Sequence, residues 1–310
     1  MLPEKATVYG TNSMIKALLE SVADDYKIYP SDTQSTWISD TVSPKDIDDL
    51  RNEANNTPSI NGWGSGADML RLRLWDDWIQ GKAPYNALRA YSCASGRVVI
   101  LAAANSNKEQ QPPPQHWIRI FRLLSPDKPV RILWFASEEK RIPPPVGEPI
   151  GPPHVNGGYA QKCNAQSIVI YRREEATRVL IHELLHASCS DPTIDSVPRL
   201  EADTEAWAEV VLCAIASHGD QHKFNKFWAI QADYSVKQAA AARKFHGVNT
   251  ESDYAWRYLT GRLDRFKALG LPLPLEAERV QPLKSLRFTA EQLLTQLEKL
   301  IDINVKSKLS

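Results

Sequence analysis

Ile181-His182-Glu183-Leu184-Leu185-His186-Ala187 is the stretch of this chain that says most about its fold and chemistry. It holds two histidines four residues apart with a glutamate directly after the first, which is the HExxH pattern. Residues i and i+4 share one face of an α-helix, so both imidazoles can reach one metal ion. The stretch therefore predicts a hydrolytic zinc site with His182 and His186 as ligands and Glu183 beside the open metal position.

The residues around the motif predict a long, largely buried helix over residues 174–188. Glu174 and Glu175 stand at its start, where the helix dipole favours acidic side chains. Unpaired polar groups are costly to bury, so two histidines and a glutamate on such a helix need a partner, and a metal ion supplies one. The apolar residues that flank the histidines are Val179, Leu180, Ile181, Leu184 and Leu185.

A catalytic zinc ion usually has three protein ligands and one open position, so the third ligand must come from a neighbouring element. Residues 200–209 are helical by composition and carry Glu201, Glu205 and Glu209 at four-residue steps, which form one acidic stripe. Such stripes commonly face solvent. Next to two imidazoles, this one is expected to face the metal and to supply one ligand.

The spacing between the motif and this stripe carries a specific resemblance. The chain reads HELLH, then eighteen residues, then Glu205. This is similar to the gluzincin group of zinc metallopeptidases, which are thermolysin-like and aminopeptidase-like. The resemblance implies that His182, His186 and Glu205 bind one Zn²⁺ ion and that Glu183 is the general base. It also implies that Glu209, where the family more often has Asp, hydrogen-bonds the first ligand histidine.

The resemblance covers residues 168–209 and implies a zincin-like fold in which residues 168–171 are the substrate-binding edge strand. A looser likeness, over residues 154–209, is to uncharacterised zincin-like proteins of large DNA viruses and protists. Residues 155–159 do not form an aminopeptidase-type exopeptidase motif. The residue that would stabilise the transition state is left open among Tyr234, His246 and Tyr254.

A second zinc-peptidase pattern, the metzincin motif HExxHxxGxxH, does not fit this chain. It requires a glycine and a histidine where Cys189 and Pro192 stand. In an aspartate-type variant of such a site, Asp191 or Asp195 would bind the metal. These two acids are therefore alternatives to the glutamate stripe.

Hydrophobic patterns divide the chain into a helical beginning, a small sheet and a helical second half. Strands are predicted at residues 97–102, 116–122, 130–135 and 167–171. Proline clusters predict surface loops at residues 112–114 and 143–153, and residues 61–66 read as a turn-rich connector. Residues 69–79 fit either a strand or a helix. Helices other than the motif helix are predicted at residues 14–22, 200–217, 221–234, 236–245, 253–269 and 289–301.

The predicted fold class is α+β and zincin-like, with a small mixed sheet of about four strands packed on the motif helix. Three regions follow one another: a mainly helical N-terminal region (1–95), the sheet with the HExxH helix (96–190), and a helical half that carries the third ligand (191–310). Residues 96–310 are expected to form one zincin domain.

The composition bears on partners and location. Lys and Arg total 37 and Asp and Glu total 37, so the formal net charge is zero and gives no electrostatic reason to bind nucleic acid or an anionic membrane. No apolar run approaches eighteen residues, and residues 1–5 lack the pattern of a cleaved signal peptide. We therefore expect an intracellular protein, cytoplasmic or, if viral, associated with the virion.

The four cysteines are widely spaced and fit no CxxC zinc pattern. We predict that Cys93, Cys163, Cys189 and Cys213 are free thiols in a reducing compartment, with one or two disulfides as the alternative.

Taken together, the motifs predict a zinc-dependent metallopeptidase that acts on a peptide or protein substrate. The alternative is a catalytically silent zincin-fold protein with a structural or assembly role. The proline-rich loops would then serve as contact surfaces for protein partners.

Overall fold

The computed structural model describes residues 13–30, 36–56, 69–81, 87–102, 112–125, 127–192, 194, 196–276 and 279–297. Its centre is a six-stranded mixed sheet with the strand order β1-β2-β3-β4-β6-β5. β3, β4 and β6 are parallel, and the other strands pair antiparallel at the two ends of the sheet. The strands are β1 (Ile38–Asp40), β2 (Ala87–Cys93), β3 (Gly96–Ala102), β4 (Val130–Ala136), β5 (Gly158–Ala160) and β6 (Ile168–Ile170).

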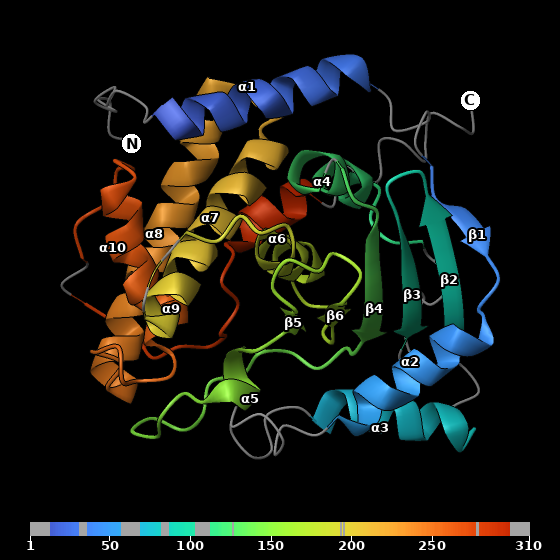
Figure 1. Cartoon of the computed structure of the whole chain (residues 1–310). Coiled ribbons are helices and arrows are strands. Elements are labelled where there is room, and N and C mark those ends of the chain that lie inside the picture. Colours follow the sequence, from blue (N-terminus) through green and yellow to red (C-terminus); the bar gives the residue numbers. More distant parts are fainter. Residues whose placement is uncertain are drawn as a thin grey trace.

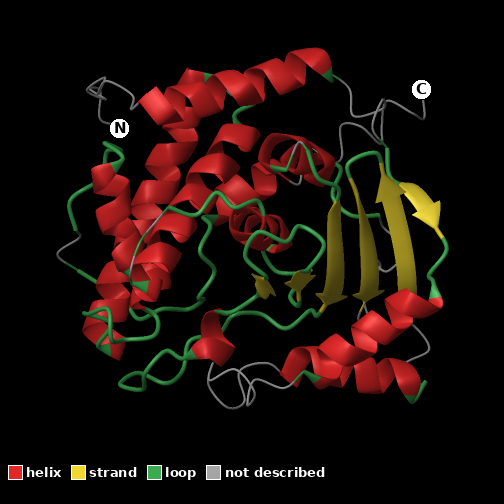
Figure 2. Cartoon of the chain, viewed as in Figure 1, coloured by secondary structure: helices red, strands yellow, loops and turns green. Residues whose placement is uncertain are grey.

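The inner strands β3 and β4 are buried on both faces, which explains their almost continuous apolar sequences. Side chains alternate between the faces, so Val98 and Ile100 enter one hydrophobic core while Val99 and Leu101 enter another. The sheet therefore separates two cores, and helices cover both (Figure 2).

The larger core contains apolar side chains of α1 (Ser13–Ile28), α4 (His116–Leu124) and α6 (Ala176–Ala187). The smaller core contains those of α2 (Pro44–Asn55) and α3 (Met69–Ile79). Figure 1 shows α2 and α3 side by side and well apart from α6. The two sets of helices thus cover opposite faces of the sheet.

The second half of the chain is helical, as predicted. It contains α7 (Val197–Ala216), α8 (Gln221–His246), α9 (Trp256–Leu259) and α10 (Gly261–Ala268), and residues 291–297 are helical as well. α7 is buried along most of its length because it packs against α6 and also against α8, α9 and α10. None of the described helices combines the length and the apolar content that a bilayer crossing needs.

The α+β class and the strands predicted at residues 97–102, 130–135 and 167–171 are confirmed. The sheet has six strands rather than about four, because β1, β2 and β5 also join it. β1 and β2 belong to the region predicted to be mainly helical, and the expected boundary at residue 95 falls in the turn between β2 and β3.

The predicted break between two helices near residue 235 is wrong, since α8 is continuous. The connector predicted at residues 61–66 lies outside the described residues.

The strand predicted at residues 116–122 is also wrong, because these residues form α4. The alternating pattern treats Arg119 as a solvent-facing residue, but it is only 1% exposed. Arg119 forms an ion pair with Asp25 and donates a hydrogen bond to the carbonyl oxygen of Tyr29 (3.1 Å). A buried ion pair therefore places this charged residue on the inner side of a helix.

The proline-rich segment at residues 143–151 forms a surface loop, as predicted, and ends in the single turn α5 (Pro152–Val155). Ile150 is buried, and the backbone N–H of Gly147 donates to the carbonyl oxygen of Phe245 (2.8 Å). Val146 is exposed. The use of this loop by protein partners stays a prediction.

Cys163 and Cys189 form a disulfide, which corrects the prediction that they are free thiols. They are 26 positions apart in the sequence, and folding brings their Cα atoms within 4.6 Å of each other. Cys93 and Cys213 are free. Disulfides persist mainly in oxidising compartments, so the intracellular location stays a prediction that the fold does not support.

The buried imidazole of His116 predicts a pH-dependent stability. Burial lowers its pKa from 6.5 to about 4, so between these values the unfolded chain binds a proton that the folded chain does not. The free energy of unfolding should therefore fall by up to about 3 kcal/mol as the pH drops from 6.5 to 4. Denaturant unfolding of wild type and His116→Gln at pH 7 and pH 4.5 checks this. An identical loss in both proteins would contradict it.

Candidate metal centre

The site residues come from two packed helices, α6 and α7. α6 begins after Glu175, whose left-handed backbone (φ 58°) turns the chain into the helix, and it ends shortly before Cys189, which is also left-handed (φ 61°). α7 begins at Val197, and the Ser196 side chain caps it by accepting a hydrogen bond from the backbone N–H of Arg199. The two helices contact each other closely. Their facing sides therefore place the motif residues against the glutamate stripe.

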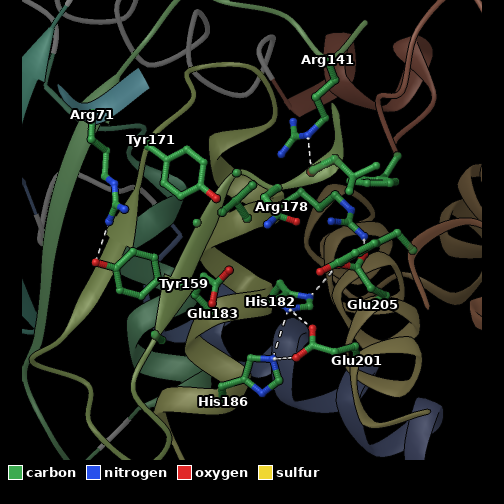
Figure 3. A pocket seen from close by; sticks show the side chains of 18 of the residues that line it. Arg71, Arg141, Tyr159, Tyr171, Arg178, His182, Glu183, His186, Glu201 and Glu205 are labelled. Carbon is green, nitrogen blue, oxygen red and sulfur yellow. Dashed lines mark hydrogen bonds and ion pairs between the residues drawn. The ribbon is translucent and has the colours of Figure 1, made fainter. Parts of the chain in front are cut away.

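His182, His186 and Glu201 form a compact group of three potential metal ligands, here called the His–His–Glu group. One ligand atom from each lies within 4.8 Å of the others. The two Nε2 atoms are 3.2 Å apart, and the Glu201 carboxylate lies 3.3 Å from Nε2 of His182 and 3.7 Å from that of His186. Ligands in a tetrahedral zinc site with bonds of 2.0–2.2 Å are separated by about 3.4 Å. Figure 3 shows the Glu201 carboxylate facing both imidazoles.

Each histidine is held from its other ring nitrogen by a buried carboxylate. Nδ1 of His182 lies 3.0 Å from Oε1 of Glu205, and Nδ1 of His186 lies 2.7 Å from Oδ1 of Asp191. Nδ1 of His186 is hydrogen-bonded to Asp191, whereas Nδ1 of His182 contacts Glu205 without a hydrogen bond, and the Nε2 atoms of both rings face Glu201. The hydrogen bond between His186 and Asp191 is the arrangement found around metal-binding histidines, in which a carboxylate fixes the tautomer and the ring orientation.

The structure changes the roles predicted for the glutamate stripe. Glu201, rather than Glu205, lies beside both Nε2 atoms, and Glu205 lies one turn further along α7 at the far side of His182. Glu209 does not hydrogen-bond His182. It accepts hydrogen bonds from Arg178 Nε (2.7 Å) and from Arg262 Nη1 (3.2 Å) instead. The spacing from His186 to the acid at the histidine pair is therefore fourteen residues, not eighteen.

Asp191 and Asp195 were the aspartates that a metzincin variant would use as ligands. Asp191 lies near the site, but on Nδ1 of His186, which makes it an orienting residue rather than a member of the His–His–Glu group. Asp195 lies outside the described residues.

Buried ion pairs fix α7 against its neighbours below the His–His–Glu group. Arg178, in the first turn of α6, pairs with both Glu205 and Glu209, and Arg262 of α10 pairs with Glu209 and donates to Gln238 Oε1 (2.7 Å). Burial raises the pKa of Glu209, although the two arginines oppose this. The charges are matched in pairs, because an isolated charge at such depth would be very unfavourable.

The acids around His186 make the site attractive to a cation. Burial alone would lower the pKa of His186, but Glu201, Glu183 and Asp191 outweigh burial and raise it to about 9. For His182 burial dominates and lowers the pKa to about 4. Burial also opposes charge on Glu201, yet its hydrogen bonds to the imidazoles hold its pKa well below the ordinary range. The same three acids would attract a divalent metal ion bound beside His186.

Glu183 lies between α6 and the edge strand β5. Burial raises its pKa to about 8, although His186 and Arg178 oppose this. β5 approaches α6 closely, since a Cβ atom added at Gly158 would lie 2.6 Å from Cγ1 of Val179 and 2.8 Å from the carbonyl oxygen of Val169. A carboxyl group that titrates near neutral pH is suited to proton transfer.

The edge of the sheet beside the site is β5 rather than the predicted strand at residues 168–171, because β6 is covered by β5. Residues 156–158 read as a turn in the sequence, and only the pairing with β6 identifies the strand. The strand predicted to be the edge, at residues 168–171, is therefore the neighbour of the observed edge strand.

A cavity of about 430 Å³ opens beside the His–His–Glu group and Glu183. Its opposite wall includes Tyr159, Tyr171 and Arg71 (Figure 3). Arg71, from α3, donates a hydrogen bond to the Tyr159 hydroxyl (2.7 Å) and lies over the Tyr159 ring, 4.9 Å from its centroid. The N-terminal helices thus contribute to the site, which no pattern in the sequence predicts.

One of the three candidates for transition-state stabilisation lies at the cavity. Tyr254 lines it, and its hydroxyl donates to Oδ1 of Asn156 (2.8 Å). Tyr258 also lines the cavity, with its hydroxyl 3.4 Å from that of Tyr254, and was not predicted. Tyr234 and His246 contact backbone carbonyl groups away from the cavity, at Arg287 and Glu148.

Arg178→Met should destabilise the protein strongly. The Arg178 side chain is 2% exposed, and its removal leaves the buried acids Glu205 and Glu209 without their shared partner. The expected loss in the free energy of unfolding is about 3–5 kcal/mol. The matched control is Arg199→Met, which breaks an ion pair with Glu251 at a side chain that is 64% exposed, and should change stability by less than about 1 kcal/mol. Chemical denaturation of both variants checks this, and equal losses would contradict it.

No family model, no curated protein and no solved structure matches this chain. The resemblance to gluzincins consequently rests on the HExxH motif and the glutamate stripe alone. The function proposed below rests on the geometry of the His–His–Glu group, Glu183 and the cavity.

Proposed function

We propose that this chain is a zinc-dependent metallopeptidase with a zincin-like arrangement, in which His182, His186 and Glu201 hold one Zn²⁺ ion. The observation that carries the proposal is the meeting of three ligand atoms within 4.8 Å of one another beside Glu183 and an open cavity. Two imidazoles and a carboxylate are a ligand set typical of catalytic zinc. They leave one coordination position for water or substrate.

Glu183 is the proposed general base. It accepts a proton from the attacking water and later returns it to the leaving amine, a role for which its position at the cavity suits it. Bound zinc would act as a Lewis acid for the water and the scissile carbonyl. Asp191 would keep the His186 imidazole in the required tautomer, and Glu205 lies beside Nδ1 of His182. Tyr254 lines the cavity, and its hydroxyl would donate to substrate only after releasing Oδ1 of Asn156.

The outer edge of β5, whose residues are partly buried, supports a peptide as the substrate. Gly157 accepts a hydrogen bond from Tyr171, and Gln161 donates one to Ser167, so alternate residues from 157 to 161 bond inward to the neighbouring chain. The backbone groups of Gly158 and Ala160 therefore point away from β6. An extended peptide can bind to such an edge by adding a strand, next to Glu183.

Metal content should distinguish Glu201 from Glu205. The wild-type protein should bind one zinc ion per chain. Glu201→Gln removes a ligand and should weaken zinc binding more than about 100-fold, whereas Glu205→Gln changes a carboxylate that contacts His182 Nδ1 and pairs with Arg178, and should weaken it about 10–100-fold. Competition with a chromophoric chelator measures both affinities. Glu276→Gln, at a side chain that is 56% exposed and paired with Arg243, is the control and should bind like wild type.

The opposite ranking, with a greater loss for Glu205→Gln, would restore Glu205 as the ligand. Zinc binding that survives in His182→Ala together with His186→Ala would remove the site from consideration.

Glu183→Gln should separate metal binding from catalysis. Without the carboxylate the water has no proton acceptor, so kcat should fall by about 10²–10⁴-fold while one zinc ion stays bound. Cleavage of a fluorescence-quenched peptide library measures turnover, and metal analysis of the same sample verifies the zinc. A variant that cleaves at the wild-type rate would refute the role of Glu183. A wild-type protein that binds zinc and cleaves no peptide would favour the silent zincin.

A further inference from the structure

The Cys163–Cys189 disulfide lies directly behind one of the two histidines of the site. It joins the loop between β5 and β6 to the end of α6. The backbone N–H groups of both cysteines donate to the same acceptor, the carbonyl oxygen of His186, at 3.0 Å from Cys163 and 3.2 Å from Cys189. The disulfide therefore lies next to the backbone of His186. The metal ligands and ion pairs described above do not account for a disulfide at this position.

Asp191 is linked to both ends of this disulfide. It follows Cys189 by two residues, its side chain is 1% exposed, and Oδ1 contacts Nδ1 of His186 at 2.7 Å. Oδ2 lies 3.7 Å from Nζ of Lys162, the residue that precedes Cys163. Asp191 is thus held between the two chain segments that the disulfide joins.

Among the described residues, the backbone hydrogen bonds of the segment that leads to Asp191 are local. Residues 190–192 have no regular secondary structure, and the described backbone hydrogen bonds from Ser188, Cys189 and Ser190 all return to the last turn of α6. A short irregular segment can place a carboxylate accurately only where covalent or packed neighbours restrict it. The disulfide is the covalent restriction at this point.

We propose that Asp191 is a positioning residue for His186 and that the Cys163–Cys189 disulfide holds it in place, so that metal affinity depends on the bridge. The inference rests on the proposed zinc site. Carboxylates that orient ligand histidines contribute about 10–100-fold to metal affinity. Loss of the disulfide should therefore weaken zinc binding by a similar factor.

The bridge can also be opened chemically. A dithiol reductant transfers two electrons to the sulfur–sulfur bond, the two sulfurs take up two protons as thiols, and the dithiol becomes a disulfide. The reaction leaves the ligand atoms of the His–His–Glu group unchanged and releases only the link behind them. Metal affinity would then report the redox state of the surroundings.

The test measures zinc affinity by chelator competition in four proteins: wild type, Asp191→Asn, Cys163→Ser with Cys189→Ser, and the triple variant. We expect binding about 10–100-fold weaker in Asp191→Asn and in the double cysteine variant. The triple variant should be no weaker than the double cysteine variant, because both changes remove the same contact. Cys93→Ser, at a free cysteine in β2, is the control and should bind like wild type.

The non-additive result separates positioning from a general structural role. A disulfide that only stabilises the fold would lower the unfolding temperature of the cysteine variant and leave the zinc affinity of the folded protein unchanged, and that outcome overturns the inference. Additive losses in the triple variant overturn it as well. If the cysteine variant does not fold, wild type reduced with a phosphine, alkylated and desalted is measured in its place.

The proposed function and this inference fail in different ways. Absence of stoichiometric zinc in oxidised wild type refutes the metal site itself. Zinc bound with equal affinity in the oxidised and reduced proteins leaves the site intact and refutes only the role of the bridge.

Discussion

The pairing of Arg178 with two glutamates is the interaction on which the site depends. Arg178 stands in the first turn of the motif helix and pairs with Glu205 and Glu209 on the facing helix, and all three side chains are almost completely buried. A slip of α7 by one helical turn, about 5.4 Å, would leave one of these charges unpaired. The arginine therefore sets the register of α7, and with it which glutamate reaches the histidine pair.

This dependence explains how far the site could be read from the sequence. His182, Glu183 and His186 were predictable because their relation is local to one helix. The choice among Glu201, Glu205 and Glu209 was not, because it depends on how two helices joined by an irregular loop slide past each other. Arg178 decides that register, yet the sequence shows it only as one more basic residue on an amphipathic helix.

The same division between local and long-range features holds for the fold. β3 and β4 were predictable because a strand buried on both faces needs a continuous apolar run. The three-residue strands β1 and β5 have no such run and exist only through pairing with a neighbour. The segment of α4 was interpreted as a strand because the partner of Arg119, Asp25, lies on α1, far away in the sequence. Asp191 was considered only as a metal ligand, because the sequence cannot show which ring nitrogen an acid will contact.

Gly158 limits which substitutions the chain can accept beside the motif helix. Even a methyl group there would collide with Val179 and with the backbone of Val169. Any substitution of Gly158 would therefore disturb the close packing of β5 against the motif helix. On the opposite wall of the cavity, Arg71 of α3 donates a hydrogen bond to the Tyr159 hydroxyl. Under the proposed function, α6 and α7 would carry the reaction, and substitutions in the α2–α3 layer would alter only the opposite wall of the cavity.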